Sequence, residues 1–453
     1  MKNGKLACLH RTESTGDLIR EGKLAIGDGY RAKNRELSDE GIPFARAGNI
    51  DSGFHFEGAD RFPSDELEKV GEKVSAPGDV VFTSKGTVGR FAYVRETTPR
   101  FVYSPQLCYW RSLDPDVIDS RWLFYWMQGG EFWLQVSGLK GQTVMADYVS
   151  LRDQRQMDIT LPPIEEQRRI ASILGSLDDK IEHNRRRAQA LERLARAIFK
   201  AWFVDFEPVR AKAEGATSFP SMPQDVFDAL PTTFVDTETG PVPDGWEIGV
   251  LGDVFALGIG GQWGSDVETD QESYPARCLR GIDCHELATG SRPNIPLRWL
   301  KPSLAARRRL EDAVVLVEGS GSNCGRSLLW RESLASLYED DVLYSNFTKR
   351  LDPLRGASHA VVAWYQLKAA YDGGTVAQYR TGSAFPNLDI MDMLKSFPIV
   401  IPDEKSASAF SDFVASFSGP HTIAENMKLA AMRDYLLPRL LSGSVELEGA
   451  NGG

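Results

Sequence analysis

The segment nearest to a known chemical motif is the glycine-rich run 319–327, Gly-Ser-Gly-Ser-Asn-Cys-Gly-Arg-Ser. A phosphate-binding loop places a lysine at a fixed distance from its glycines, because that lysine reaches the β- and γ-phosphates. Here the spacing differs, and Arg326 stands where the lysine is required. We therefore interpret the run as a loop after a predicted strand that offers hydrogen-bond donors and acceptors.

The histidines and cysteines form no catalytic or metal-binding pattern. The six histidines are scattered, no HExxH is present, and the five cysteines form no CxxC pair. Cys284-His285 is an isolated pair without a second pair at zinc spacing. No Asn-Pro-Pro-aromatic or Asp-Pro-Pro-Tyr sequence, the usual signature of amino-methyltransferases, occurs. The sequence thus predicts no catalytic residue and no metal ligand, and the sparse cysteines favour a reducing cytoplasm.

Composition indicates a globular chain of two to four domains. The 453 residues carry a net charge of −11, with 42% hydrophobic and 25% charged side chains, which argues against disorder and fibrous structure. The longest apolar runs are far shorter than the ~20 residues that span a bilayer, so no membrane segment is expected. An acidic protein is a poor candidate for binding nucleic acid. Residues 1–160, however, hold 21 basic and 23 acidic side chains, so this region is almost neutral.

The chain repeats itself once, at a period of roughly 232 to 242 residues. Short matches recur in the same order with small drifts in spacing. Examples are Gly89-Arg90 with Gly325-Arg326, Val102-Tyr103-Ser104 with Leu343-Tyr344-Ser345, and Leu113-Asp114-Pro115 with Leu351-Asp352-Pro353. Each copy opens with β-branched and aromatic runs between glycines and prolines, which predicts a mixed α/β domain.

A long helix is predicted after the first domain, over 164–203. Pro162-Pro163 and Glu165-Glu166 suit a helix N-terminus. Apolar and small residues then alternate at intervals of four and three from Ile170 to Trp202, which is typical of a coiled-coil seam. The C-terminal copy repeats this spacing from Ile423 to Leu440, but Ser418-Gly419-Pro420 and Pro438 predict a kink or a break. Packing the two seams antiparallel against each other buries both.

The expected fold is α+β: two mixed α/β domains in a tandem pseudo-repeat, separated by two long helical regions packed as an antiparallel coiled coil. Six prolines within 37 residues predict a stiff linker after the first helix, long enough to return alongside it. The predicted parts are a first domain at 1–160, a helical spacer at 161–206, the linker at 207–243, a second domain at 244–402 and a C-terminal helical spacer at 403–453.

The helix motif resembles a known family. Leu161–Ile170 (Leu-Pro-Pro-Ile-Glu-Glu-Gln-Arg-Arg-Ile), continuing through Leu177-Asp-Asp-Lys-Ile181 to Phe199–Pro208, resembles the first conserved region of type I restriction–modification specificity subunits. Pro243-Asp-Gly-Trp246 resembles the entry to their second target recognition domain. Arg433–Gly443 resembles the end of their second conserved region. The chain departs from the family in residues 405–411, which lack the Glu-Glu-Gln of the first copy.

The resemblance implies a non-catalytic subunit that reads double-stranded DNA with its two domains. It also implies two methyltransferase (modification) subunits and two translocase/nuclease (restriction) subunits as partners. S-adenosylmethionine, ATP and Mg²⁺ would belong to those partners, so no cofactor is expected in this chain. Because the two domains differ in sequence, the DNA target should be bipartite and asymmetric. Two other hypotheses remain open: a stand-alone DNA-modifying enzyme, and a coiled-coil scaffold without a role on DNA.

Candidate DNA-binding residues are polar side chains that follow predicted strands and can reach a base edge or a phosphate. In the first domain we expect Lys85, Thr87, Arg90, Gln106, Lys140 and Gln142 to take this role, and in the second Ser322, Asn323, Arg326, Asn346, Lys349 and Arg380.

Two further sets of residues concern the helices. Trp202, Phe203 and Phe206 lie together at a helix end, where we expect an exposed apolar patch that binds a partner subunit. The alternative is that these aromatics pack on the chain's own domain. Asn184 and Asn426 occupy equivalent seam positions, and we expect them to meet and to fix the register of the helix pair. The alternative is that each faces solvent or a partner.

Overall fold

The computed structural model describes residues 10–50, 53–86, 88–140, 149–237, 240–382, 385–416 and 420–445. The chain forms two compact units. Unit 1 comprises Met1–Lys180 and Leu429–Gly453, and unit 2 comprises Ile181–Lys428. Each unit contains one copy of the repeat together with parts of the two long helices.

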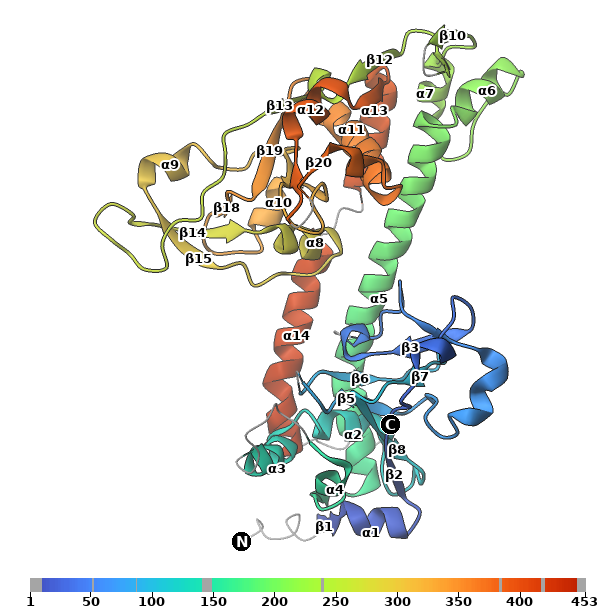
Figure 1. Ribbon diagram of the computed structural model, residues 1–453, viewed down its shortest axis with the longest axis vertical. Coiled ribbons are helices and arrows are strands. Elements are labelled where there is room, and N and C mark those ends of the chain that lie inside the picture. The colour runs from blue at the N-terminus through green and yellow to red at the C-terminus, as the bar shows by residue number, and fades with distance from the viewer. Residues whose placement is uncertain are drawn as a thin grey trace, which may run out of the picture. The chain divides into compact units, whose positions relative to one another are not determined.

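The first copy, residues 11–161, lies in unit 1 and is built around a four-stranded antiparallel sheet of order β2-β8-β5-β6. A three-stranded sheet, β4-β3-β7, and the closing pair β1-β9 complete it. Helix α2 covers β5 and β6 (Figure 1), where Trp122 and Trp126 join the sheet residue Trp110 in the core. The elements are β1 Arg11–Ser14, α1 Thr15–Arg20, β2 Leu24–Asp28, β3 Ile42–Ala45, β4 Arg61–Phe62, β5 Val80–Thr83, β6 Phe91–Tyr93, β7 Val102–Tyr103, β8 Leu107–Ser112, α2 Ser120–Trp126, α3 Gly130–Lys140, α4 Leu151–Gln154 and β9 Asp158–Leu161.

The second copy, residues 247–401, lies in unit 2 and repeats this plan. Its sheets have the orders β13-β19-β16-β17 and β15-β14-β18, with the closing pair β12-β22. The elements are β12 Glu247–Val250, β13 Phe255–Leu257, β14 Tyr274–Leu279, α8 Gly281–Ala288, β15 Leu297–Leu300, α9 Pro302–Ala306, β16 Val315–Glu318, β17 Ser327–Leu329, α10 Glu332–Ala335, β18 Val342–Tyr344, β19 Thr348–Pro353, α11 Gly356–Asp372, β20 Arg380–Thr381, β21 Asn387–Leu388, α12 Ile390–Ser396 and β22 Pro398–Ile401.

Strand register aligns the two copies residue by residue. Trp110 of β8 pairs with Val80, and Leu351 of β19 pairs with Val315, so equivalent positions of these two strands lie 241 residues apart. The matches at Val102-Tyr103-Ser104 and at Gly89-Arg90 agree with the sheet topology. The match of Leu113 with Leu351 is wrong, because β8 ends at Ser112 and its equivalent β19 ends at Pro353. Leu113 therefore corresponds to Leu354.

Capping residues and prolines determine where the long helices begin and end. Helix α5 spans Ile164–Phe203, as predicted, and its seam residues Ile170, Leu174 and Ala195 are buried. The C-terminal region forms two helices, α13 Glu404–Ala415 and α14 Pro420–Leu441, so the expected interruption is confirmed. In unit 1, the N-terminal part of α5 shares a core with Leu440 of α14. The mixed fold and the long helix are confirmed.

The proline-rich segment, which we expected to be a stiff linker long enough to return alongside the helix, is folded instead. It forms α6 Glu207–Ala213, α7 Gln224–Ala229 and the hairpin β10 Phe234–Thr237 with β11 Gly240–Pro243. Val209, Phe227 and Leu230 bury one another in a small core. Helix α7 packs on α13. The segment thus caps the C-terminal end of α5 within unit 2.

Candidate nucleic-acid interface

Three loops of the second copy meet at one end of its four-stranded sheet. The loop after β16 is tied to the turn before β19, because Gly319 N donates to Phe347 O at 2.8 Å. It is also tied to the β20–β21 hairpin: Leu388 N donates to Gly319 O and Gly321 N donates to Pro386 O, both at 2.9 Å. These bonds fix the backbone of a surface that is built from segments far apart in the sequence.

The polar residues predicted for the second copy divide into two groups. Ser322, Asn323 and Asn346 are exposed on these loops, and Lys349 is half-buried in β19. Arg326 and Arg380 instead hold the loop. The Arg326 guanidinium donates to Glu318 Oε2 at 2.9 Å, and Arg380 Nε donates to Cys324 O at 2.9 Å. The structure therefore gives these two arginines contacts within the fold that the prediction of base contact did not include.

In the first copy, Lys85, Arg90 and Gln106 are exposed on the corresponding loops. Lys140 is the last residue of α3, and its side chain is not among the described ones. Thr87 and Gln142 lie outside the described residues. The structure thus brings together three of the six predicted residues at the end of the sheet β2-β8-β5-β6.

The loop frames of the two copies are the same in detail. In the first, Gly89 N donates to Thr83 O and Thr83 N to Arg90 O; in the second, Gly325 N donates to Glu318 O and Glu318 N to Arg326 O. Both glycines adopt positive φ, 104° and 97°. A Cβ on Gly89 would lie 2.4 Å from the Trp133 ring, and one on Gly325 would lie 2.5 Å from Val376. Glycine is required in both copies because the loop must turn against a packed side chain.

Sequence reasoning missed two exposed aromatic rings on the second copy. Phe347 is 59% exposed and Phe385 is 82% exposed, and both belong to the loops just described. Large exposed apolar side chains within a polar rim are typical of contact surfaces. The repeat contained a signal for Phe347, because Phe347 lies 241 residues after Gln106, one of the candidate DNA-binding residues.

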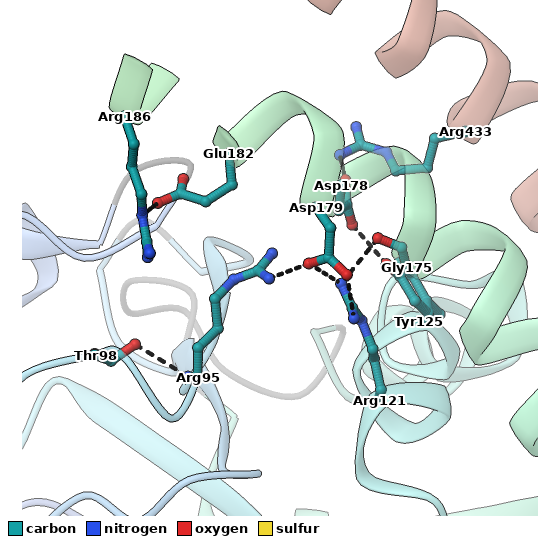
Figure 2. Close-up of polar contacts among 10 residues, drawn as sticks. All are labelled: Arg95, Thr98, Arg121, Tyr125, Gly175, Asp178, Asp179, Glu182, Arg186 and Arg433. Atoms are coloured by element: carbon teal, nitrogen blue, oxygen red, sulfur yellow. Dashed lines mark hydrogen bonds and ion pairs between the residues drawn. The ribbon is translucent and has the colours of Figure 1, made fainter. Parts of the chain in front are cut away.

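A charged cluster fixes helix α5 within unit 1 (Figure 2). The carboxylate of Asp179 accepts two hydrogen bonds from Arg121, at 2.7 and 2.8 Å, and a third from Arg95. Asp178 accepts from the Tyr125 hydroxyl at 2.7 Å and from the Arg433 guanidinium of α14 at 2.9 Å. The adjacent aspartates thus bind the first copy and α14 to the same turn of α5.

The electrostatics of this cluster follow from its contacts. Hydrogen bonds from Arg121, and a further one from Arg95, lower the pKa of Asp179 to about 2. Burial raises the pKa of Tyr125, and the charge of Asp178 raises it further, so this hydroxyl stays protonated and donates. Gly175 leaves room for Arg121, whose guanidinium also donates to the Gly175 carbonyl at 3.0 Å. Asp178 and Asp179 are part of the motif that resembles the family, but the sequence alone assigned them no role.

Unit 2 holds the same helix by a different residue. Glu192 of α5 accepts from Lys368 at 2.7 Å and from the Tyr365 hydroxyl at 3.2 Å, both on α11. Burial lowers the pKa of Lys368, and Glu192 opposes this effect by favouring the charged amine. Tyr365 and Tyr125 are therefore equivalent, because each hydroxyl donates to a carboxylate of α5 and joins its own copy to that helix.

The two seam asparagines are in contact within unit 2. Asn184 Nδ2 donates to Asn426 Oδ1 at 2.9 Å and to Glu425 Oε2 at 2.8 Å. Asn184 is buried and Asn426 is half-buried. The expectation that they meet thus agrees with the hydrogen bond, and their role in fixing register stays a prediction.

The expected aromatic docking patch does not exist, because these side chains are buried. Trp202, Phe203 and Phe206 are 2%, 1% and 7% exposed. Phe203 packs edge-to-face on Phe410 of α13 and also contacts Trp246. The alternative, packing on the chain's own domain, is the correct one. The end of α5 is covered by α13 and by the folded proline-rich segment, which the sequence did not place there.

Within the described part of the chain, no group of three or more histidine, cysteine or acidic side chains is arranged to hold a metal ion. No described helix combines the length and the apolar character needed to cross a membrane.

Comparison with known proteins agrees with the helix motif. A family model described as the type I restriction modification DNA specificity domain matches residues 24–193. The type I restriction enzyme HindI specificity subunit of Haemophilus influenzae is 22% identical over 428 residues, covering 84% of this chain and 89% of that protein. The MjaIX specificity subunit of Methanocaldococcus jannaschii is 26% identical over 201 residues, covering 42% and 38%.

A solved structure shares the fold. The S subunit of a type I restriction–modification system from M. genitalium superposes with a TM-score of 0.51 at 11% identity, covering 97% of both chains. At this identity the likeness concerns the fold alone. Taken together with the sequence matches, these findings confirm the family resemblance: residues 24–193 match the type I restriction modification DNA specificity domain, and most of the chain is similar to specificity subunits of type I restriction enzymes.

Proposed function

We propose that the protein is the DNA specificity subunit of a type I restriction–modification complex and that each copy of the repeat reads one half of a bipartite, asymmetric target. The observation that carries this proposal is the pair of loop frames. Their backbone hydrogen bonds are the same, yet the exposed side chains on them differ. A shared frame with different side chains suits two readers of different base sequences.

A domain exchange tests this function. Residues 1–160 would be replaced by the corresponding domain of a related specificity subunit, and methylated motifs would be mapped by sequencing DNA from cells that carry the complex. We expect one half of the motif to change and the other to persist. A motif in which both halves change, or neither, contradicts the assignment of one half-site to each copy. An uninterrupted palindromic motif contradicts the bipartite target itself.

The chemistry would be supplied by partner subunits. We propose that this chain is not an enzyme and binds no cofactor, and that it assembles with two modification and two restriction subunits that use S-adenosylmethionine, ATP and Mg²⁺. Its similarity to specificity subunits favours this function over a stand-alone enzyme or a scaffold without a role on DNA. The buried free thiols of Cys108, Cys278, Cys284 and Cys324 support a reducing, cytoplasmic location.

Because the aromatic cluster is buried, we propose another docking face for the modification subunit. Met432 and Tyr435 of α14 are 53% and 59% exposed and lie one helical turn apart. The Arg439 guanidinium stacks over the Tyr435 ring at 3.6 Å and holds it in place. Replacing Met432 and Tyr435 with serine should weaken assembly in gel filtration and leave the melting temperature unchanged. Unchanged assembly with a normal melting curve contradicts this docking face.

A further inference from the structure

The two copies present one side chain each at the same point of the loop frame, and the two side chains differ in chemistry. In the first copy, Gln106 O accepts a hydrogen bond from Ser84 N at 3.0 Å. In the second, Phe347 O accepts from Gly319 N at 2.8 Å. Each residue immediately precedes a six-residue strand, β8 or β19. The structure therefore makes Gln106 and Phe347 equivalent residues.

The turn that carries them is closed in the same way in both copies. Leu107 N donates to the carbonyl of the buried Ser104 at 2.9 Å, and Thr348 N donates to that of the buried Ser345 at 3.0 Å. The backbone on both sides of each presented residue is thus fixed. A fixed backbone aims a side chain at a ligand without a further loss of conformational freedom on binding.

Exposure of Phe347 calls for a reason beyond folding. Burying a phenylalanine ring stabilises a protein by about 1.5–3 kcal/mol, and the fold forgoes much of this by leaving 59% of Phe347 exposed. Its surroundings are exposed polar groups of the same loops, Asn346 next to it and Ser322 and Asn323 on the loop after β16. An apolar ring within a polar rim fits a ligand that is itself apolar at one point and polar around it.

Double-stranded DNA offers such a point in the major groove. The 5-methyl group of thymine is the apolar feature of a base edge there, and phenylalanine is among the side chains that contact it. The amide of glutamine instead matches the N6 and N7 of adenine, to which it forms paired hydrogen bonds. Glutamine in one copy and phenylalanine in the other thus match different bases, as two different half-sites require.

We propose that Gln106 and Phe347 are equivalent base-reading positions: Gln106 selects an adenine in one half-site through its amide, and Phe347 selects a thymine in the other through its 5-methyl group. This proposal rests on the proposed function and specifies two of its base contacts.

The test begins with the motif, which is mapped by sequencing methylated DNA from cells carrying the wild-type complex. Binding of the complex is then measured to duplexes in which each thymine of the half-site read by the second copy is replaced in turn by deoxyuridine, which lacks only the methyl group. We expect one replacement to weaken wild-type binding by about fourfold, the effect of one buried methyl group. Phe347→Ala should bind the thymine and deoxyuridine duplexes equally.

The chain offers a matched control on the same strand. Leu354 is also 59% exposed, and it follows the last residue of β19 where Phe347 precedes the first. The two lie about 20 Å apart along the strand. Leu354→Ala should keep the wild-type response to deoxyuridine, and its melting temperature should match that of Phe347→Ala.

The first copy is tested in the same way with 7-deazaadenine, which lacks the N7 acceptor. Wild type should lose affinity at one adenine, and Gln106→Ala should bind roughly 5- to 150-fold more weakly and become insensitive to the analogue. Leu113→Ala, at the equivalent end of β8, is the control. Phe347→Gln should shift the preferred base at its position from thymine to adenine.

The outcomes separate this inference from the function on which it rests. A wild-type complex without a bipartite motif overturns the proposed function. A bipartite motif with Phe347→Ala and Leu354→Ala behaving alike overturns the inference and leaves the function standing. Uniform weakening of Phe347→Ala on every duplex, with the deoxyuridine response retained, also overturns it, because the ring would then contact something other than the methyl group.

Discussion

Asn184 and Asn426 share a hydrogen bond of 2.9 Å although they lie 242 positions apart in the sequence. Both stand at seam positions of long helices, where an apolar residue would pack without needing a partner. The amide of Asn184 is also bonded to Glu425, so both of its donor hydrogens are used. We therefore predict that this buried, hydrogen-bonded amide favours one register of the two helices over its neighbours.

This contact predicts coupling between the two asparagines. Asn184→Leu should lower the free energy of unfolding by about 1–3 kcal/mol, because it removes the donor from Asn426 and Glu425. Asn184→Leu with Asn426→Leu should be destabilised by less than the sum of the single changes, with an interaction energy of roughly 0.5–3 kcal/mol. A double-mutant cycle in urea unfolding measures this. Strict additivity contradicts the structural role of the pair.

The Asp178 contacts predict a position-specific loss of stability on α5. Asp178→Ala removes the acceptor from the buried Tyr125 hydroxyl and from Arg433, and should cost about 1–3 kcal/mol. Glu182→Ala, one turn further along the helix, removes an exposed pair with Arg186 and should cost only about 0.3–0.5 kcal/mol. Thermal unfolding of both variants checks this. Equal losses would mean that the cluster contributes no more than an exposed ion pair.

The lowered pKa of Asp179 predicts a pH window for stability. A carboxylate whose pKa is lower in the folded state stabilises the fold above its unfolded pKa, near 3.8, and this contribution is lost as the pH falls through the folded value, about 2. The melting temperature of wild type should therefore exceed that of Asp179→Asn by a constant amount above about pH 5. The difference should shrink between about pH 4 and about pH 2. A difference that persists at the lowest pH contradicts this origin.

Much of the helical architecture was predictable, because its signals are local and periodic. The alternating four-three spacing and Pro162-Pro163 defined α5 to the residue. The predicted interruption of the C-terminal helical region is confirmed, because α13 ends at Ala415 and α14 begins at Pro420, a residue that suits the first turn of a helix. The repeat was also visible in the sequence. The spacing of its matches drifted, however, because the exact alignment depends on strand register, and the sequence does not identify the pairing partners.

The sequence left two sets of side-chain contacts undetermined. Arg326, whose contact with DNA stays a prediction, pairs with Glu318 of β16 in the folded chain. Six prolines indicated a stiff spacer, but Val209, Phe227 and Leu230 supply enough apolar surface to bury one another. Both outcomes depend on which side chains pack together in three dimensions, which composition and spacing leave undetermined.

Because the aromatic cluster is buried, we expect Phe203 to stabilise the fold rather than to bind a partner subunit. Phe203 is 1% exposed and packs on Phe410 and Trp246, so Phe203→Ala leaves a cavity and should lower the free energy of unfolding by about 3–5 kcal/mol. Val204, the next residue, is 50% exposed, and Val204→Ala should change stability by about 0.5 kcal/mol or less. Chemical unfolding separates the two variants. Any weakening of assembly in Phe203→Ala should then parallel its loss of folded protein. Assembly should recover at lower temperature, where more of the variant is folded. Normal stability with weakened assembly at every temperature would instead restore Phe203 to a docking surface.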